Sequence, residues 1–273
     1  MEVLSSSDLI SDLKQEEVDK RFQLLKYKVN ELEIEKIWGR FTDTGFEPIL
    51  IKGWAASRLY PEPLSRHFSD VDLMIAPERF QDALEFSKTV REKLPVDLHV
   101  GARHLDSIAF ENLFANSIEI KCNKTMVRIL RPEDHLRILC IHWLTDGGAY
   151  KEKLWDIYYG IANRAENFDW DRFLNITTSQ RRRWLICTIG LAHKYLGLDI
   201  EKTPIAAEAK NLPSWLTKTV EREWAGEVKM LPLEMFLNDK KMLWEQIKKR
   251  IPPNPIQATV LEEGDFDKYP RIG

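Results

Sequence analysis

The residues from 48 to 76, PILIKGWAASRLYPEPLSRHFSDVDLMIA, decide the fold that the sequence predicts. The short apolar run before Lys52 is typical of a buried strand, and Gly53 ends it. Residues 54–60 have a helical composition, a loop with prolines follows, and a second apolar run starts at Asp70. The stretch therefore predicts a strand, a glycine turn, a helix, a loop and a second strand in succession.

Two carboxylates open the second of these strands. Side chains alternate along a strand, so Asp70 and Asp72 point to one face and Val71 points to the other. Neighbouring carboxylates repel each other unless a cation lies between them. Magnesium is held in proteins by a few carboxylates together with substrate phosphates, so this layout suits a metal-bound triphosphate. The alternative is a pair of surface aspartates that cap a loop.

The same stretch resembles the nucleotidyltransferase superfamily of the DNA polymerase β type. More closely, it is similar to an uncharacterised bacterial nucleotidyltransferase family that has a Lys-Gly turn and an Arg…Asp-x-Asp motif. The pieces of this chain that meet the pattern are Lys52-Gly53, Tyr60-Pro61, Arg66 and Asp70-x-Asp72. The superfamily usually has Gly-Ser or Gly-Gly at the turn, whereas this chain has Gly53-Trp54. The resemblance covers about fifty residues, from Pro48 to Val100.

The resemblance implies a fold, a reaction and a set of ligands. The fold would be α+β, with a nucleotidyltransferase-like mixed β-sheet core, flanking helices and a mainly α-helical C-terminal domain. The reaction would be Mg²⁺-dependent transfer of a nucleotidyl group from ATP or another nucleoside triphosphate to an acceptor hydroxyl or phosphate. Asp70 and Asp72 would ligate two magnesium ions with a third carboxylate from a later strand, for which Asp97 is the candidate. Asp97 would also deprotonate the acceptor hydroxyl.

Five further residues are expected around these carboxylates. Lys52 and Arg66 are the cations assigned to the triphosphate, although a strand-end lysine and a salt bridge to an aspartate are the simpler interpretations. Gly53 would let the backbone approach the phosphates. Ser57, one turn into the following helix, would either bind the nucleotide or serve packing alone. His99 shares a strand face with the third carboxylate and could orient the acceptor, or it could be a structural histidine.

Composition limits the class of protein. The chain has 273 residues, of which 44% are hydrophobic and 30% charged, as in ordinary globular proteins. A net charge of −3 argues against binding of bulk nucleic acid by the whole surface. Three cysteines without a Cys-x-x-Cys pair fit a reducing compartment. No apolar run is long enough for a bilayer and the N-terminus lacks an export pattern, so a cytoplasmic location without a membrane partner is expected.

Periodicity predicts the order of the elements. The chain is expected to form an N-terminal helix and the core over 1–130, a helical domain over 131–251 and an extended tail over 252–273. Helices are predicted over 15–44, 77–94, 110–114, 132–145, 151–165, 169–177, 180–196, 214–225 and 232–251. A strand is predicted over 96–100 and a hairpin over 117–130. The first helix should pack on the sheet with the stripe Val18, Phe22, Leu25, Val29, Leu32 and Ile37.

The helical domain is the expected source of acceptor selection. Sites of this kind lie preferentially between domains, and the segment 151–159 combines an apolar face with polar tips. The family that this chain resembles has a similar segment at this place. Lys153 and Asp156 are therefore predicted to hold the base or the acceptor. The alternative is that the aromatic residues of this segment are core. The expected acceptor is a small molecule or a peptide.

Two other functions remain open. One is a toxin-like nucleotidyltransferase that modifies RNA or protein. The other is a non-catalytic module that binds nucleotide, against which the third carboxylate argues because a binding module would not need it.

Overall fold

The computed structural model describes residues 6–100, 108–175, 178–226, 230–231 and 233–268, with side chains in the first helix described from residue 17. The chain divides into two compact units. Residues 1–103 and 109–131 form the first, which we call the sheet unit. Residues 104–108 and 132–273 form the second, which we call the helical unit. Each unit is described by itself.

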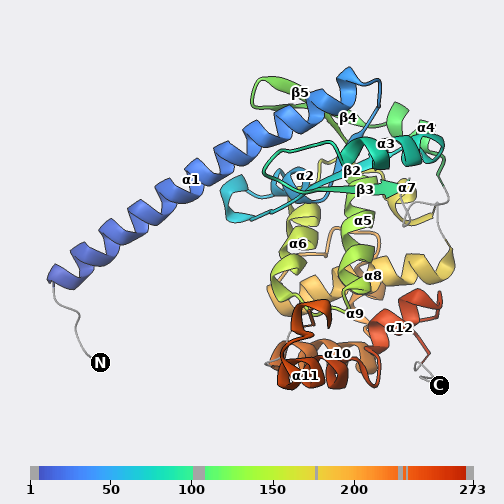
Figure 1. Ribbon diagram of the computed structural model, residues 1–273. Coiled ribbons are helices and arrows are strands. Elements are labelled where there is room, and N and C mark those ends of the chain that lie inside the picture. The colour runs from blue at the N-terminus through green and yellow to red at the C-terminus, as the bar shows by residue number, and fades with distance from the viewer. Residues whose placement is uncertain (1–5, 101–107, 176–177, 227–229, 232, 269–273) are drawn as a thin grey trace. The chain divides into compact units, whose positions relative to one another are not determined.

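The sheet unit contains a five-stranded mixed sheet with the strand order β3-β2-β1-β5-β4 (Figure 1). Its strands are β1 (Ile49–Ile51), β2 (Val71–Ile75), β3 (Val96–Val100), β4 (Ile118–Cys122) and β5 (Thr125–Ile129). β1 runs antiparallel to β2 and parallel to β5, β2 and β3 are parallel, and β4 and β5 form an antiparallel hairpin. The mixed sheet, the strand at 96–100 and the hairpin are confirmed.

Helices cover one face of this sheet. α1 (Ser6–Asp43) and α3 (Phe80–Ser87) share an apolar core with α2 (Gly53–Ser57) and with Val71, Leu73 and Ile75 of β2. Because side chains alternate along β2, Asp72 and Met74 point to the face opposite these helices. A short helix, α4 (Phe110–Ala115), precedes the hairpin. The expected helix over 77–94 is shorter than predicted, since a 3₁₀ turn occupies Pro77–Arg79 and α3 ends at Ser87.

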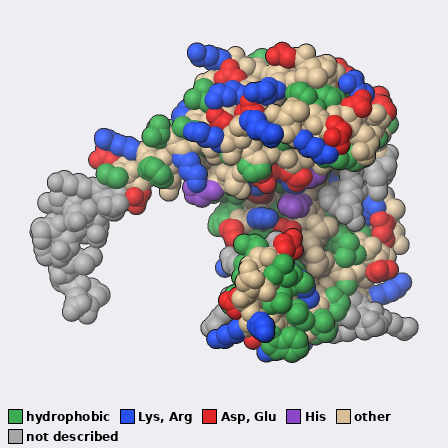
Figure 2. All heavy atoms as spheres, viewed as in Figure 1, with side chains coloured by type: hydrophobic (Ala, Val, Ile, Leu, Met, Phe, Trp, Pro, Cys, Tyr) green, Lys and Arg blue, Asp and Glu red, His purple; other side chains and the backbone are tan. Residues whose placement is uncertain are grey.

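The predicted packing face of α1 is wrong for most of its residues. The side chains that enter the sheet core are Tyr27, Ile34, Ile37, Trp38 and Phe41. Of the expected stripe, Val18, Phe22, Leu25, Val29 and Leu32 are exposed, and apolar side chains are visible on the projecting part of α1 in Figure 2. The helix carries two apolar rows, and helical periodicity does not tell which of two rows meets the sheet.

Helices are the regular elements of the helical unit among its described residues, and loops connect them. They are α5 (Pro132–Thr145), α6 (Leu154–Ala162), α7 (Trp170–Asn175), α8 (Ser179–Leu196), α9 (Ala206–Lys210), α10 (Ser214–Ala225), α11 (Lys240–Arg250) and α12 (Pro255–Leu261). The helical C-terminal part of the fold prediction is confirmed. Local signals set the ends of α8, because the Thr178 side chain accepts a hydrogen bond from the amide of Arg181, and Gly197 closes the helix with φ of 72°.

The expectation of an extended tail over 252–273 is wrong for α12. Asn254 caps this helix by accepting hydrogen bonds from the amides of Ile256 and Gln257, and Pro255 takes the first helical position. Ile256 and Phe266 are fully buried in the core of the helical unit. The helix predicted over 232–251 also begins later, at Lys240, because Asp239 caps it there.

The three cysteines are free and buried in the two cores. Burial raises the pKa of Cys122, in the sheet unit, to about 12. Burial likewise raises the pKa of Cys187 to about 12 and raises the pKa of Cys140, both in the helical unit. Among the described helices, none has the length and apolar composition that crossing a bilayer requires.

Candidate active site

A strained turn leads from β1 into α2. Lys52 has φ of 48° and ψ of −138°, and Gly53 has φ of 27°. A non-glycine residue in such a conformation costs on the order of 1–3 kcal/mol, and strain of this kind gathers at functional sites. A Cβ atom at position 53 would lie 3.5 Å from the Asp70 carbonyl oxygen and 3.7 Å from Asp72 Oδ2. The turn therefore lies directly against the start of β2.

Four side chains meet where β1, β2 and β3 are adjacent. The register of β2 and β3 pairs Asp72 with Asp97 and Met74 with His99. Lys52 Nζ lies 2.7 Å from Asp72 Oδ1, and His99 Nε2 lies 2.9 Å from the same oxygen. His99 Nε2 is also 3.3 Å from Asp97 Oδ2. The sequence predicted Asp97 and His99 on one face of their strand. In the structure His99 contacts the Asp72 carboxylate and Asp97 contacts His99.

Charge balance differs between the two aspartates of β2. Burial acts to raise the pKa of Asp72, but the hydrogen bond from His99 and the Lys52 ammonium outweigh it, so this pKa lies below its ordinary value. Burial raises the pKa of Asp70, and the charge of Asp72 raises it further. Lys52 opposes this rise, and the charge of Asp97 adds to it. Among the described residues, Asp70, Asp72 and Asp97 carry more negative charge at this site than Lys52 neutralises.

A metal ion fits this set of donors. Among the described residues, one ligand atom each from Asp72, Asp97 and His99 lie within 4.8 Å of one another. Asp70 is outside that group, but the charges of Asp72 and Asp97 both act on it. The structure thus brings together two of the three predicted metal ligands, adds an imidazole, and leaves the third carboxylate beside them. The convergence of all three carboxylates on one ion stays a prediction.

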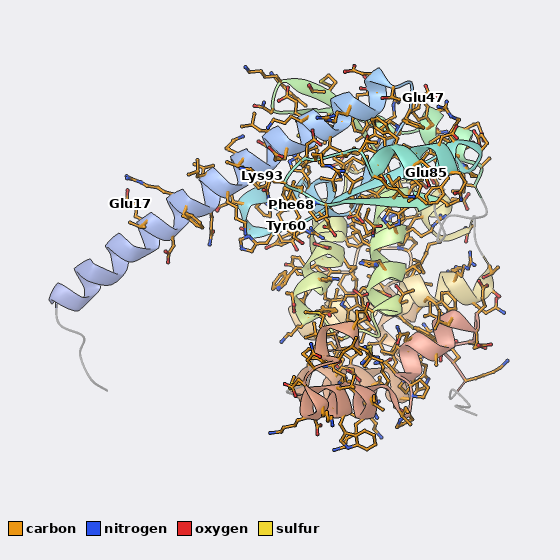
Figure 3. All side chains as sticks on the ribbon, viewed as in Figure 1. Glu17, Glu47, Tyr60, Phe68, Glu85 and Lys93 are labelled. Atoms are coloured by element: carbon orange, nitrogen blue, oxygen red, sulfur yellow. The ribbon has the colours of Figure 1, made fainter. Side chains whose placement is uncertain are left out.

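The loop from α2 to β2 is tied to its surroundings. Arg66 Nη1 donates a 2.8 Å hydrogen bond to the Gly53 carbonyl, so the predicted phosphate ligand holds the strained turn. Phe68, labelled with Tyr60 in Figure 3, packs edge to face on Tyr27 of α1 with ring centres 5.9 Å apart. The Phe68 carbonyl also accepts a 3.4 Å hydrogen bond from Asn30.

Ser57 is directed at α1 in this structure. Its side chain is fully buried, donates a 2.7 Å hydrogen bond to the Trp54 carbonyl and lies 3.1 Å from the Tyr27 hydroxyl. These contacts pack Ser57 against α1, and its role in nucleotide binding stays a prediction.

The two predicted acceptor residues belong to the helical unit. Lys153 Nζ lies 2.8 Å from Asp146 Oδ2 and 4.6 Å from the centre of the Tyr150 ring. Asp156 is buried in α6 with 4% of its surface exposed. Their neighbours Trp155, Tyr158 and Tyr159 form a half-buried cluster with ring centres 4.9 to 5.5 Å apart. The role of Lys153 and Asp156 at the carboxylates stays a prediction.

Comparison with known proteins points to one class. Over residues 18–86 the chain matches the model of a family described as "Uncharacterised nucleotidyltransferase". The match contains Lys52, Gly53, Arg66, Asp70 and Asp72 and ends before β3. It supports the resemblance to nucleotidyltransferases, while the particular bacterial family stays a prediction.

A solved structure of an antigenic nucleotidyltransferase-like protein from Paracoccidioides brasiliensis is similar to this chain. The sequence identity is 18% and the TM-score 0.44, with 62% of this chain and 90% of that chain covered. No curated protein matches the chain.

Proposed function

We propose that this chain transfers a nucleotidyl group from a nucleoside triphosphate to an acceptor hydroxyl or phosphate, with release of pyrophosphate. The observation that carries the proposal is the excess of carboxylate charge at Asp70, Asp72 and Asp97, within reach of the strained turn at Lys52. The turn and the first two carboxylates lie inside the region that matches a nucleotidyltransferase family.

The carboxylates would hold divalent cations. Asp72 and Asp97 already have oxygens oriented toward a common nitrogen, and Asp70 adjoins them. Magnesium in two-ion form is the expected cofactor, and its chemistry is to neutralise charge on the attacking and leaving oxygens. Asp72 is 5% exposed and Asp97 is exposed, so the first is a fixed anchor and the second faces incoming substrate.

The turn would receive the triphosphate. The Lys52 ammonium lies 2.7 Å from Asp72 Oδ1 and can bind a phosphate oxygen while remaining beside this carboxylate. Gly53 has φ of 27°, a backbone conformation that residues with a side chain rarely adopt, and without a side chain it would let a phosphate approach the turn. Arg66 keeps this backbone in place through the Gly53 carbonyl and adds positive charge to the loop.

Asp97 is the group proposed to accept the proton of the acceptor hydroxyl. Its exposed carboxylate can be reached from solvent, and the contact with His99 orients it. The acceptor is proposed to be a small molecule or a peptide. Modification of RNA or of a folded protein, and nucleotide binding without turnover, are the competing functions.

One experiment separates these functions. The protein is incubated with Mg²⁺ and each α-labelled nucleoside triphosphate in turn, together with pools of small molecules, peptides, RNA or proteins. We expect label to enter the small-molecule or peptide pool, and Asp72→Asn to abolish it. Efficient labelling of bulk RNA would overturn the proposed acceptor. Tight nucleotide binding without labelling of any pool would identify a binding module.

A further inference from the structure

We infer that His99 is itself a metal ligand, and that the carboxylate site takes a divalent first-row transition ion in preference to Mg²⁺. The inference deepens the proposed function and rests on it, because it concerns the same carboxylates. The residues that carry it are Asp72, Asp97 and His99.

The donor spacing is that of ligands around one ion. His99 Nε2 is 2.9 Å from Asp72 Oδ1 and 3.3 Å from Asp97 Oδ2. Two neighbouring ligands at right angles around an octahedral ion, each about 2.1 Å from it, lie about 3 Å apart. Both measured separations are close to this value, so the imidazole nitrogen and the two carboxylate oxygens can occupy neighbouring positions around one ion.

The position of His99 is set by the sheet. β3 pairs in register with β2, and His99 stands two residues after Asp97 on the same face. The imidazole is 28% exposed, and the Asp72 carboxylate is 6% exposed. Without an ion, Nε2 lies at hydrogen-bond distance from Asp72 Oδ1. The other tautomer, with the proton on Nδ1, would present the Nε2 lone pair to an ion held by the carboxylates.

An imidazole donor changes which ion the site prefers. Magnesium is a hard cation that takes oxygen ligands and keeps several waters. Imidazole suits transition ions, and the affinity of a mixed nitrogen and oxygen site rises along that series from Mn²⁺. A site of carboxylates alone would lack this nitrogen contribution. The mixed donor set therefore predicts tighter binding of Mn²⁺ than of Mg²⁺, with the difference carried by His99.

The test uses Mn²⁺ as the probe and reads binding directly. Electron paramagnetic resonance of the full chain counts bound Mn²⁺, and electron spin echo modulation detects ¹⁴N coupling from a coordinated imidazole. We expect wild-type protein to show this coupling, with Mg²⁺ displacing Mn²⁺ only at large excess. His99→Gln should abolish the coupling and weaken Mn²⁺ binding about 10- to 100-fold, with a smaller effect on Mg²⁺.

A matched control tests the assignment of the nitrogen. His67 is exposed in the loop before β2, so His67→Gln removes an imidazole of the same unit that lies outside the donor cluster. His67→Gln should keep the ¹⁴N coupling. Circular dichroism of both variants monitors the fold. The ¹⁴N coupling of the wild-type protein tests the inference even if a variant fails to fold.

The outcomes separate this inference from the proposed function. Bound Mn²⁺ without ¹⁴N coupling, together with nucleotidyl transfer, would overturn the inference and leave the function standing. Coupling lost in His99→Gln, with no transfer to any acceptor, would support the inference and overturn the function. An absence of Mn²⁺ binding would overturn the inference.

Discussion

Both units bury carboxylates, but they balance the charge differently. In the helical unit, Asp134 is fully buried and its two oxygens accept hydrogen bonds from Arg172, with Nη2 2.7 Å from Oδ2 and Nε 3.0 Å from Oδ1. In the sheet unit, Asp72 Oδ1 is approached by Lys52 and His99. Two further carboxylates lie close by, since the charges of Asp72 and Asp97 both raise the pKa of Asp70.

This difference distinguishes a structural ion pair from a binding site. A planar guanidinium bonded to both oxygens of Asp134 satisfies that carboxylate within the protein, so the pair needs nothing from outside. In the sheet unit, burial is the main cause that raises the pKa of Asp70. The neighbouring charge of Asp72 raises it further. Such uncompensated charge is typical of a functional site.

The largest expected effect comes from removing one charge of the sheet site. Asp70→Asn should lower nucleotidyl transfer on the order of 10³-fold, because Asp70 would help to hold the metal ion that stabilises charge at the reacting phosphate. The metal-free protein should keep or gain stability, since the substitution relieves repulsion from Asp72 and Asp97. Labelled-nucleotide assays and urea unfolding measure the two effects. Loss of stability in parallel with activity would mean that Asp70 is structural.

The reverse pattern is expected in the helical unit. Asp134→Asn leaves Arg172 without its paired carboxylate and removes a stabilising charge near the buried Arg137, so it should cost about 3–5 kcal/mol of unfolding free energy. Urea titration followed by circular dichroism measures this cost. The control is Asp171→Asn, since Asp171 is an exposed residue of the neighbouring helix. Equal effects of the two substitutions would contradict the comparison.

A smaller effect is expected from the lysine that balances the sheet site. Lys52→Ala should weaken nucleotide binding about tenfold, the effect of one charge-assisted contact. It should also reduce the salt dependence of binding, because salt screens the charge that is lost. Calorimetric titration at two salt concentrations checks both effects. The control is Lys88→Ala, which changes an exposed lysine directly after α3 and should bind nucleotide like wild type.

The smallest effect is expected at Glu33, a carboxylate of the sheet unit that accepts hydrogen bonds from within the protein. The side chain of Lys36 lowers the pKa of Glu33 by hydrogen bonding, the Lys93 amide adds to this, and burial opposes it. Because the folded pKa lies below the unfolded one, this stabilisation is complete above the unfolded pKa and is lost as pH falls through the folded value. Glu33→Gln should cost about 1 kcal/mol at pH 7 and less at pH 3. Thermal unfolding at the two pH values checks this, and a pH-independent cost would contradict the assignment.

Local patterns predicted more of the fold than of the contacts. The two-residue period of Asp70 and Asp72, and that of Asp97 and His99, predicted which side chains share a strand face. The register that pairs Asp72 with Asp97 depends on which strands become neighbours, and this is set by tertiary packing. For this reason the contact of His99 with both carboxylates could not be read from spacing alone.

Two errors have different physical origins. The buried row of α1 could not be chosen, because Phe22 and Phe41 lie on rows of similar apolar character and only the sheet distinguishes them. The helix α12 had a readable signal in Asn254-Pro255, a capping residue followed by proline at the first position, which the acidic and proline-rich composition of the tail obscured.

The buried cysteines allow the opening of each unit to be followed by modification of their thiols. A thiol reagent attacks the thiolate, and at neutral pH a thiol with a pKa of about 12 reacts only when its surroundings open. Modification of Cys122 then reports opening of the sheet unit, and modification of Cys187 reports opening of the helical unit. Peptide mapping of one labelled sample thus yields two opening rates from a single chain. A bound metal or nucleotide should slow the first rate.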